Sequence, residues 1–161
     1  MARFTHQILA TSEGTTKGLA EQFAVLAEQG DCFLLFGQIG AGKSLFARAF
    51  IQKRLRDQGR LEDVPSPTFT LVQTYDDGIS EFWHADLYRV TNDGELDELG
   101  LIEAMEQAVT LIEWPDRVVD LAPKDAVSVS FETNETPDER IVTFAFDNPK
   151  WEPLFHSLGV D

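Results

Sequence analysis

Cysteine, long apolar runs and basic residues are all scarce in this sequence, and each scarcity excludes a class of protein. The 161 residues include one cysteine, Cys32, which rules out an internal disulfide and favours a reducing compartment. No apolar run approaches the roughly 20 residues that span a bilayer, and residues 1–10 lack the charged and then apolar pattern of a secretory signal. We therefore expect a cytoplasmic protein, and we exclude a membrane protein and a disulfide-built secreted domain.

The length and composition favour one folded unit. Apolar residues make up 43% of the chain and charged residues 25%, which are the proportions of a soluble globular protein. No internal repeat, low-complexity tract or linker interrupts the sequence. We therefore expect a single domain over residues 1–161.

Basic residues are outnumbered, because 13 Lys and Arg face 28 Asp and Glu, for a net charge of −15. Such a chain repels the phosphates of nucleic acid over most of its surface. One segment, residues 43–60, is the exception, with six basic residues and only Asp57 opposing them: Lys43, Arg48, Lys53, Arg54, Arg56 and Arg60. This segment is either a solvated helix face or a patch for a phosphate-bearing ligand, an acidic partner or tRNA.

Apolar periodicity predicts alternating strands and helices. Strands are expected at residues 4–10, 32–36, 71–74, 81–90, 109–112, 127–131 and 142–146. Helices are expected from Ser12 or Thr15 to about Gln29, and over residues 43–58, 96–107 and 151–158. The fully apolar runs 32–36 and 109–112 suit buried strands, and the two pairs 71–90 and 127–146 suit hairpins. We predict an α/β fold with a mixed parallel and antiparallel sheet flanked by helices.

A glycine-rich loop follows the apolar run at residues 32–36. It matches the pattern G-x-x-x-x-G-K-[ST] at every defined position. Glycines let successive backbone N–H groups turn inward to form an anion nest, and the following helix N-terminus adds partial positive charge. In such a loop Lys43 reaches the β- and γ-phosphates, and the Ser44 hydroxyl can bind Mg²⁺. The motif predicts a P-loop NTPase-like site for a purine nucleoside triphosphate with Mg²⁺, made by Gly37, Gln38, Ile39, Gly40, Ala41, Gly42, Lys43 and Ser44.

A P-loop protein needs a further acid near the metal, and two residues compete for that role. Glu113 directly follows the strand expected at 109–112, at the carboxyl end, where ligands of open α/β sheets bind. It could bind Mg²⁺ directly or through water, act as the general base, or be an ordinary acid at a strand end. Asp86 is its rival, since strand alternation places His84, Asp86 and Tyr88 on one face. These three could form a hydrogen-bonded network, and His84 with Asp86 is weak evidence for a metal pair.

Two further features bear on which class of P-loop protein this is. The segment Ser66-Pro67-Thr68-Phe69-Thr70 carries three hydroxyls, and in nucleotide switches such a segment can sense the γ-phosphate; otherwise it is a polar loop. GTPases usually carry an Asn-Lys-x-Asp motif that reads the base, and none occurs here.

The motifs together, in order and spacing, resemble the TsaE family. The resemblance covers about residues 12–117. It rests on the P-loop and on Ser-Pro-Thr-Phe-Thr-Leu-Val (66–72), His-Ala-Asp-Leu-Tyr-Arg (84–89), Glu95-Leu96 to Leu99-Gly100, and Leu-Ile-Glu-Trp-Pro (111–115). Ser44 replaces the threonine that is more usual in this family, which keeps the hydroxyl. Ala85 replaces a commoner phenylalanine.

This resemblance implies an ATPase that is weak alone and acts with a transferase made of TsaD and TsaB. That transferase places a threonylcarbamoyl group on the adenosine beside the anticodon of certain tRNAs. By position, the resemblance implies phosphate binding by Lys43, Mg²⁺ binding by Ser44 and Glu113, hydrolysis or switching by Asp86 and Thr68, a packing or partner role for Trp114, and nucleotide contacts by Ser12, Glu13 and Asp116.

Two other functions remain open at this point. The first is a small-molecule or nucleotide kinase, which usually needs a lid with clustered arginines. Outside residues 43–60 the arginines are scattered along the chain: Arg3, Arg89, Arg117 and Arg140. The second is an interaction module that nucleotide controls without hydrolysis.

Overall fold

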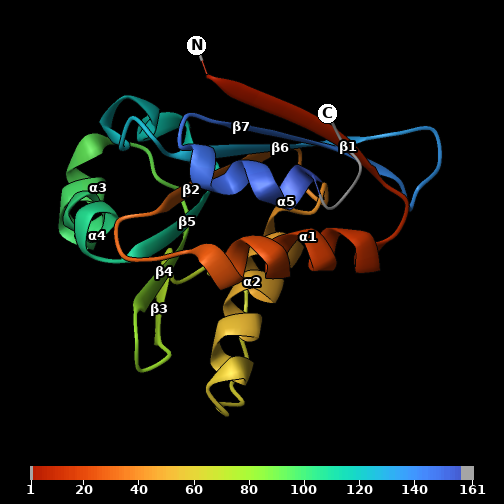
Figure 1. The fold of residues 1–161 in the computed structure, drawn as a ribbon. Coiled ribbons are helices and arrows are strands. Elements are labelled where there is room, and N and C mark those ends of the chain that lie inside the picture. Colours follow the sequence, from red (N-terminus) through yellow and green to blue (C-terminus); the bar gives the residue numbers. More distant parts are fainter. Residues whose placement is uncertain (1, 157–161) are drawn as a thin grey trace.

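One seven-stranded mixed sheet forms the centre of the structure, a computed structural model that describes residues 2–156. The central strands β6, β2, β5 and β4 are parallel, whereas β7, β1 and β3 pair antiparallel with their neighbours (Figure 1). The predicted α/β fold with a mixed sheet is therefore confirmed. The strand order across the sheet is β1 (Phe4–Ala10), β7 (Arg140–Phe146), β6 (Val127–Thr133), β2 (Cys32–Gly37), β5 (Val109–Glu113), β4 (Glu81–Asp86) and β3 (Val72–Asp76).

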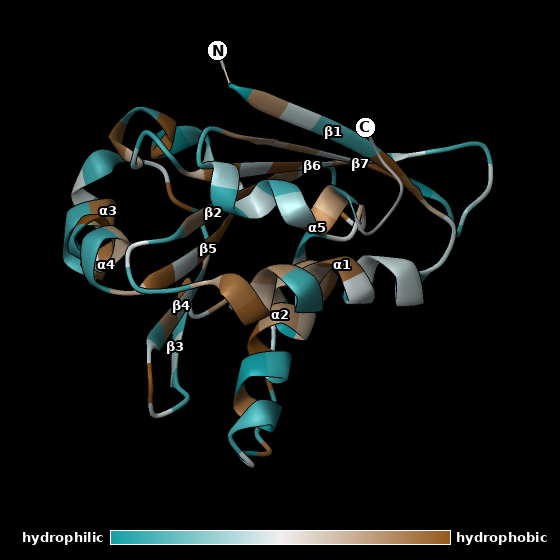
Figure 2. Cartoon of the chain, in the orientation of Figure 1, coloured by the Kyte–Doolittle hydropathy of each residue, from teal (hydrophilic) through white to brown (hydrophobic). Residues whose placement is uncertain are grey.

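Helices pack on both faces of this sheet and divide the apolar core in two. The larger cluster joins the sheet to α1 (Glu13–Leu26), α2 (Lys43–Asp57) and α5 (Glu152–His156). The smaller cluster joins it to α3 (Asp93–Leu99) and α4 (Leu101–Gln107). In Figure 2 the end of α2 farthest from the sheet is mostly hydrophilic.

Strand β2 shows why a continuous apolar run suits this position. Its side chains alternate between the faces, so Phe33 and Leu35 lie in the larger cluster while Cys32 and Leu34 lie in the smaller one. Burial raises the pKa of the Cys32 thiol to about 12, which leaves it uncharged and unreactive.

Helix α1 begins where the sequence predicts, because the Ser12 side chain accepts a hydrogen bond from the Thr15 amide. It ends at Leu26, however, and not at Gln29. The guanidinium of Arg54 on α2 donates to the carbonyls of Ala24 and Ala27 at 2.9 and 2.6 Å, and Ala27 has extended backbone. A side chain from another helix thus satisfies the last carbonyls of α1, an effect that local periodicity cannot indicate.

Three other predicted elements have different boundaries. The strand expected over residues 81–90 ends at Asp86, whose side chain accepts from the Tyr88 amide and turns the chain. The helix expected over residues 96–107 is two helices separated by Gly100, which has a φ of +73°. The C-terminal helix follows a 3₁₀ turn at Pro149–Trp151 and is described only to His156, so its predicted end lies outside the described residues.

A buried ion pair ties the β3–β4 hairpin to α2, and through Arg54 to the end of α1. Arg54 Nε donates to Asp77 Oδ2 at 3.0 Å, and both side chains are at most one-tenth exposed. Burial alone would raise the pKa of Asp77, but the amides of Ser80 and Ile79 and the Arg54 charge bring that pKa below its usual value.

We expect Asp77→Asn to destabilise the chain by about 3 kcal/mol near neutral pH, because it leaves the Arg54 charge buried without its counter-ion. Since the pKa of Asp77 is lower in the folded chain, its contribution is complete above its unfolded pKa of about 4 and is lost as the pH falls through the folded value. Chemical denaturation of both variants at neutral and acid pH measures this difference. Asp57→Asn, on the exposed end of α2, is the matched control, and an equal effect of the two substitutions would contradict the role of the buried pair.

Candidate functional site

The carboxyl ends of three parallel strands meet at one edge of the sheet. In the β2–β5 pairing Leu35 lies opposite Glu113, and in the β4–β5 pairing Asp86 lies opposite Glu113. Strand β2 ends at Gly37, where the glycine-rich loop begins. The sheet therefore brings residues 37–44, Glu113 and Asp86 together, as the sequence predicts.

Glycine is required at two positions of the loop. Gly37 has a φ of +147°, and a Cβ there would lie 2.8 Å from the carbonyl oxygen of Phe131. Gly42 has a φ of +120°, and a Cβ there would lie 3.3 Å from the Phe131 ring. The loop thus follows β6 so closely that side chains are excluded, and its backbone turns directly into α2 at Lys43.

Lys43 lies inside the site, with 4% of its surface exposed. Its ammonium donates to the carbonyls of Gly37 and Gln38 at 2.5 and 2.8 Å and lies 4.2 Å from the centre of the Trp114 ring. Burial lowers the pKa of this ammonium, while the charges of Glu113 and Asp86 act in the opposite direction. The lysine is therefore a buried cation whose present partners are two carbonyls and an aromatic ring, and its ammonium can bind an anion.

Glu113 is the most enclosed acid of the site, with 2% of its surface exposed. Its Oε1 accepts from the Ser44 hydroxyl at 2.8 Å, and its Oε2 lies 2.6 Å from Nε2 of His84. A hydroxyl and a carboxylate oxygen are the ligand types that Mg²⁺ prefers. The two residues predicted to hold Mg²⁺ are thus in direct contact.

Asp86 is arranged differently. Its Oδ1 accepts from the Tyr88 amide at 3.0 Å, and its Oδ2 lies 3.4 Å from the Thr68 hydroxyl, at the margin of hydrogen-bond distance. His84 and Asp86 share the buried face of β4. Tyr88 lies beyond the strand, and the centre of its ring is 4.7 Å from the centre of the Trp114 ring. The prediction that all three share a strand face is therefore wrong for Tyr88, because the strand ends at Asp86.

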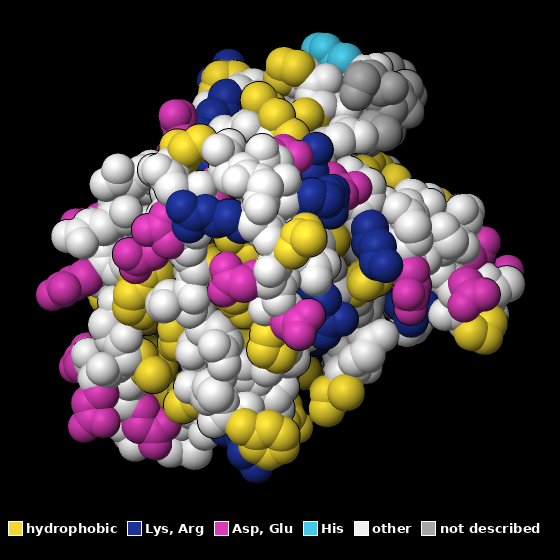
Figure 3. Space-filling model, turned by 90° about the horizontal axis from the view of Figure 1, so that it is seen from below, with side chains coloured by type: hydrophobic (Ala, Val, Ile, Leu, Met, Phe, Trp, Pro, Cys, Tyr) yellow, Lys and Arg dark blue, Asp and Glu magenta, His cyan; other side chains and the backbone are white. Residues whose placement is uncertain are grey.

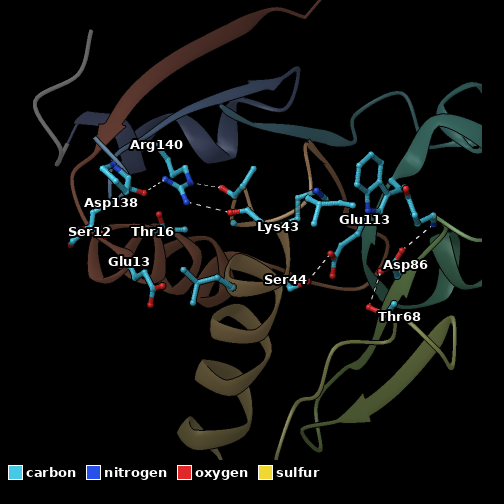
Figure 4. Close-up of a pocket in the computed structure, with 18 residues that line it drawn as sticks. Ser12, Glu13, Thr16, Lys43, Ser44, Thr68, Asp86, Glu113, Asp138 and Arg140 are labelled. Atoms are coloured by element: carbon cyan, nitrogen blue, oxygen red, sulfur yellow. Dashed lines mark hydrogen bonds between the residues drawn. The ribbon is translucent and has the colours of Figure 1, made fainter. Parts of the chain in front are cut away.

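These residues line a pocket of about 420 Å³. In Figure 4, Ser12, Glu13, Thr16, Asp138 and Arg140 lie toward one end, Glu113, Asp86 and Thr68 lie toward the other, and Lys43 lies between them. Of the residues predicted to contact nucleotide, Ser12, Glu13 and residues 39–44 line the pocket. Gly37 and Gln38 are not lining residues, but their carbonyls accept hydrogen bonds from Lys43, which is one. Asp116 is exposed and is not a lining residue, because the chain turns at Trp114 into a 3₁₀ helix, Pro115–Arg117.

Sequence reasoning missed the contribution of the β6–β7 turn. Arg140 donates from Nε to the Ala41 carbonyl at 3.1 Å and from a terminal nitrogen to the Gly40 carbonyl at 3.3 Å. It also donates to the carbonyls of Pro137 and Glu139 within its own turn. Arg140 therefore connects the glycine-rich loop to a turn about 100 residues later in the chain, and no local pattern around Arg140 indicates this.

The basic segment 43–60 does not form one charged surface. Lys43 is in the pocket and Arg54 is buried, while Arg48 donates to the Val64 carbonyl and Arg60 to that of Asp76. Lys53 pairs with Asp57 and Arg56 pairs with Glu21. Basic and acidic side chains are interspersed on the face shown in Figure 3. A helix of 3.6 residues per turn distributes the positions on α2 around its axis. The basic residues therefore lie in several environments, and neither alternative, a single solvated face or a single patch, describes them all.

Among residues 2–156, no cluster of three or more His, Cys, Asp or Glu side chains is suited to hold a metal ion. Across the same residues, no helix is long and apolar enough to cross a membrane.

The fold and the loop define an α/β protein of the P-loop type, in which a strand, a glycine-rich loop and a helix form one wall of a pocket. The family model described as threonylcarbamoyl adenosine biosynthesis protein TsaE matches residues 10–142. The chain therefore belongs to the TsaE family, a family of tRNA threonylcarbamoyladenosine biosynthesis, and the predicted resemblance is confirmed.

Curated relatives and a solved structure agree with this assignment. The TsaE protein of Rickettsia bellii is 36% identical over 130 residues, covering 81% of this chain and 88% of the relative. The TsaE protein of Bacillus subtilis is 33% identical over 145 residues, covering 89% and 87%. The crystal structure of Bacillus subtilis YdiB is 28% identical with a TM-score of 0.74, covering 99% of this chain and 96% of that one.

We expect Arg140→Met to increase amide hydrogen exchange of the glycine-rich loop about tenfold, because the loop loses the donors that hold its carbonyls. Hydrogen–deuterium exchange of residues 37–44 without ligand measures this effect. Arg89→Met is the control, since the Arg89 guanidinium lies over the exposed Phe69 ring and bonds no loop carbonyl. Unchanged exchange in Arg140→Met would show that the loop keeps its shape without this contact.

Proposed function

We propose that this chain is the Mg²⁺-dependent, ATP-binding and ATP-hydrolysing subunit of tRNA threonylcarbamoylation, acting with the TsaD–TsaB transferase. The observation that carries the proposal is the contact of the Ser44 hydroxyl with the Glu113 carboxylate at the end of a glycine-rich loop. Family membership supplies the tRNA modification, and the pocket supports the nucleotide chemistry. With its net charge of −15, the chain would meet tRNA through its partners.

The two ends of the pocket suit the two halves of ATP. The loop amides and Lys43 would bind the phosphates, and leaving its carbonyl partners would let the Lys43 ammonium reach the β- and γ-phosphates. Ser12, Glu13 and Asp138 would face the nucleoside. Because phosphate oxygens add negative charge beside Lys43, nucleotide binding would raise the lowered pKa of its ammonium.

Ser44 and Glu113 would hold Mg²⁺, since both present oxygen atoms at one point of the pocket. The ion, when bound, would neutralise charge on the phosphate oxygens. Glu113 has both carboxylate oxygens engaged, whereas Oδ2 of Asp86 has, among residues 2–156, only the distant Thr68 hydroxyl. We therefore assign the general base to Asp86, with Thr68 orienting it.

In this mechanism water attacks the γ-phosphorus and the bond from that phosphorus to the β–γ bridging oxygen breaks. Oδ2 of Asp86 accepts the proton that the water loses, and ADP leaves with the electron pair of the broken bond. Thr68 and Phe69 belong to one loop, which links the reacting end of the pocket to an exposed aromatic ring. A partner bound there could change the position of Thr68, which would explain activation by the transferase.

We expect little phosphate release from ATP by the purified chain and a clear increase with the TsaD–TsaB pair.

Lys43→Ala should abolish this phosphate release by removing phosphate binding. Asp86→Asn should slow it about 100-fold or more while ATP still binds, because the base is lost. Asp97→Asn, an exposed acid on α3, should leave the rate unchanged.

Phosphate release and binding of labelled ATP, measured on the same samples, separate the alternatives. ATP binding without any release in the presence of the partners would favour a nucleotide-controlled interaction module. Failure of the partners to stimulate release, together with phosphate transfer to an added metabolite, would favour a kinase.

A further inference from the structure

The two oxygens of Glu113 have different partners. Oε1 is in contact with the Ser44 hydroxyl at the pocket wall, and Oε2 is in contact with the imidazole of His84 at 2.6 Å. The side chains of His84 and Glu113 are 1% and 3% exposed. The hydrogen bond to His84 therefore lies in the protein interior, behind the oxygen that faces Ser44.

Parallel pairing of β4 with β5 makes this contact possible. His84 lies opposite Leu111 and Asp86 lies opposite Glu113. The imidazole therefore reaches diagonally across the pair of strands to Glu113, two residues beyond its direct partner Leu111. Because a carboxylate only accepts hydrogen bonds, Nε2 of His84 carries the hydrogen of this contact. The other ring nitrogen, Nδ1, is buried and has no hydrogen-bond partner within the part of the chain that the structure describes. The ring thus has a single polar contact there, and that contact is with Glu113.

We propose that His84 is a positioning residue that holds Oε2 of Glu113 in the interior, so that the carboxylate presents Oε1 alone beside Ser44. This inference rests on the proposed Mg²⁺ site. Without the imidazole, the carboxylate is free to turn and to present both oxygens to the pocket. Mg²⁺ requires near-octahedral geometry with few protein ligands, whereas Ca²⁺ accepts bidentate carboxylates. The contact would therefore set both the affinity for the ion and the preference for Mg²⁺ over Ca²⁺.

The test compares two substitutions of nearly equal length. His84→Gln keeps an N–H donor near the place of Nε2, whereas His84→Met has a similar volume and no donor. We expect the Met variant to need at least about tenfold more Mg²⁺ for half-maximal binding of labelled ATP, and to lose most of its preference for Mg²⁺ over Ca²⁺. The Gln variant should recover both properties. Binding of the labelled nucleotide without any divalent ion should be the same in all three chains.

The readouts separate this role from a structural one. Thermal unfolding first establishes that both variants fold, and a purely structural histidine would change the melting temperature without changing the ratio of Mg²⁺ to Ca²⁺ affinity. Equal ion dependence of the Met and Gln variants would overturn the role of His84 alone. A native chain whose nucleotide binding does not depend on Mg²⁺, and is not altered by Glu113→Gln, would overturn the Mg²⁺ site itself and this inference with it.

Discussion

The parallel pairing of β2, β5 and β4 is the constraint on which the pocket depends. Glu113 lies opposite Leu35 on one side and Asp86 on the other, so three strand ends, each carrying one part of the site, coincide at one edge. A shift of one residue in either pairing would turn the side chains of a whole strand to the opposite face. The apolar clusters on the two faces oppose such a shift, since each strand carries residues of both. Packing of the core thereby fixes the position of the polar groups.

Three of the acidic and basic side chains that line the pocket are themselves largely buried. Lys43, Glu113 and Asp86 are each less than one-tenth exposed, and every one has polar partners: carbonyls for the lysine, a hydroxyl and an imidazole for Glu113, an amide for Asp86. Such groups are tolerated in a protein interior only when they are paired or hydrogen-bonded. The two acids Glu113 and Asp86 outnumber the single lysine, and this favours a cation beside them. The arrangement of buried charge is thus consistent with the proposed ligand.

Local patterns predicted the parts of the site that follow one another in the chain. The glycine-rich loop, the strand ending at Glu113 and the cap at Ser12 each depend on neighbouring residues, and the structure has them where expected. The missed features depend on contacts between distant residues. Arg140 reaches the loop from the β6–β7 turn, Arg54 ends α1 from another helix, and the turn at Trp114 leads Asp116 away from the pocket. A sequence pattern states which residues are present, but it does not state which distant backbone groups they will meet.

Strands that come much later in the chain form the wall of the glycine-rich loop, and this has a consequence for synthesis. Phe131 and Arg140 contact the loop, and β6 is the neighbour of β2 in the sheet, although β2 precedes it by about 90 residues. During translation, the loop and α2 leave the ribosome long before β6 and β7 are made. A nascent chain that already contains residues 37–44 therefore has the phosphate-binding sequence without the surface that shapes it. The pocket is completed only once β6 and β7 have been made, so a product truncated before β6 would retain the motif and lack the site.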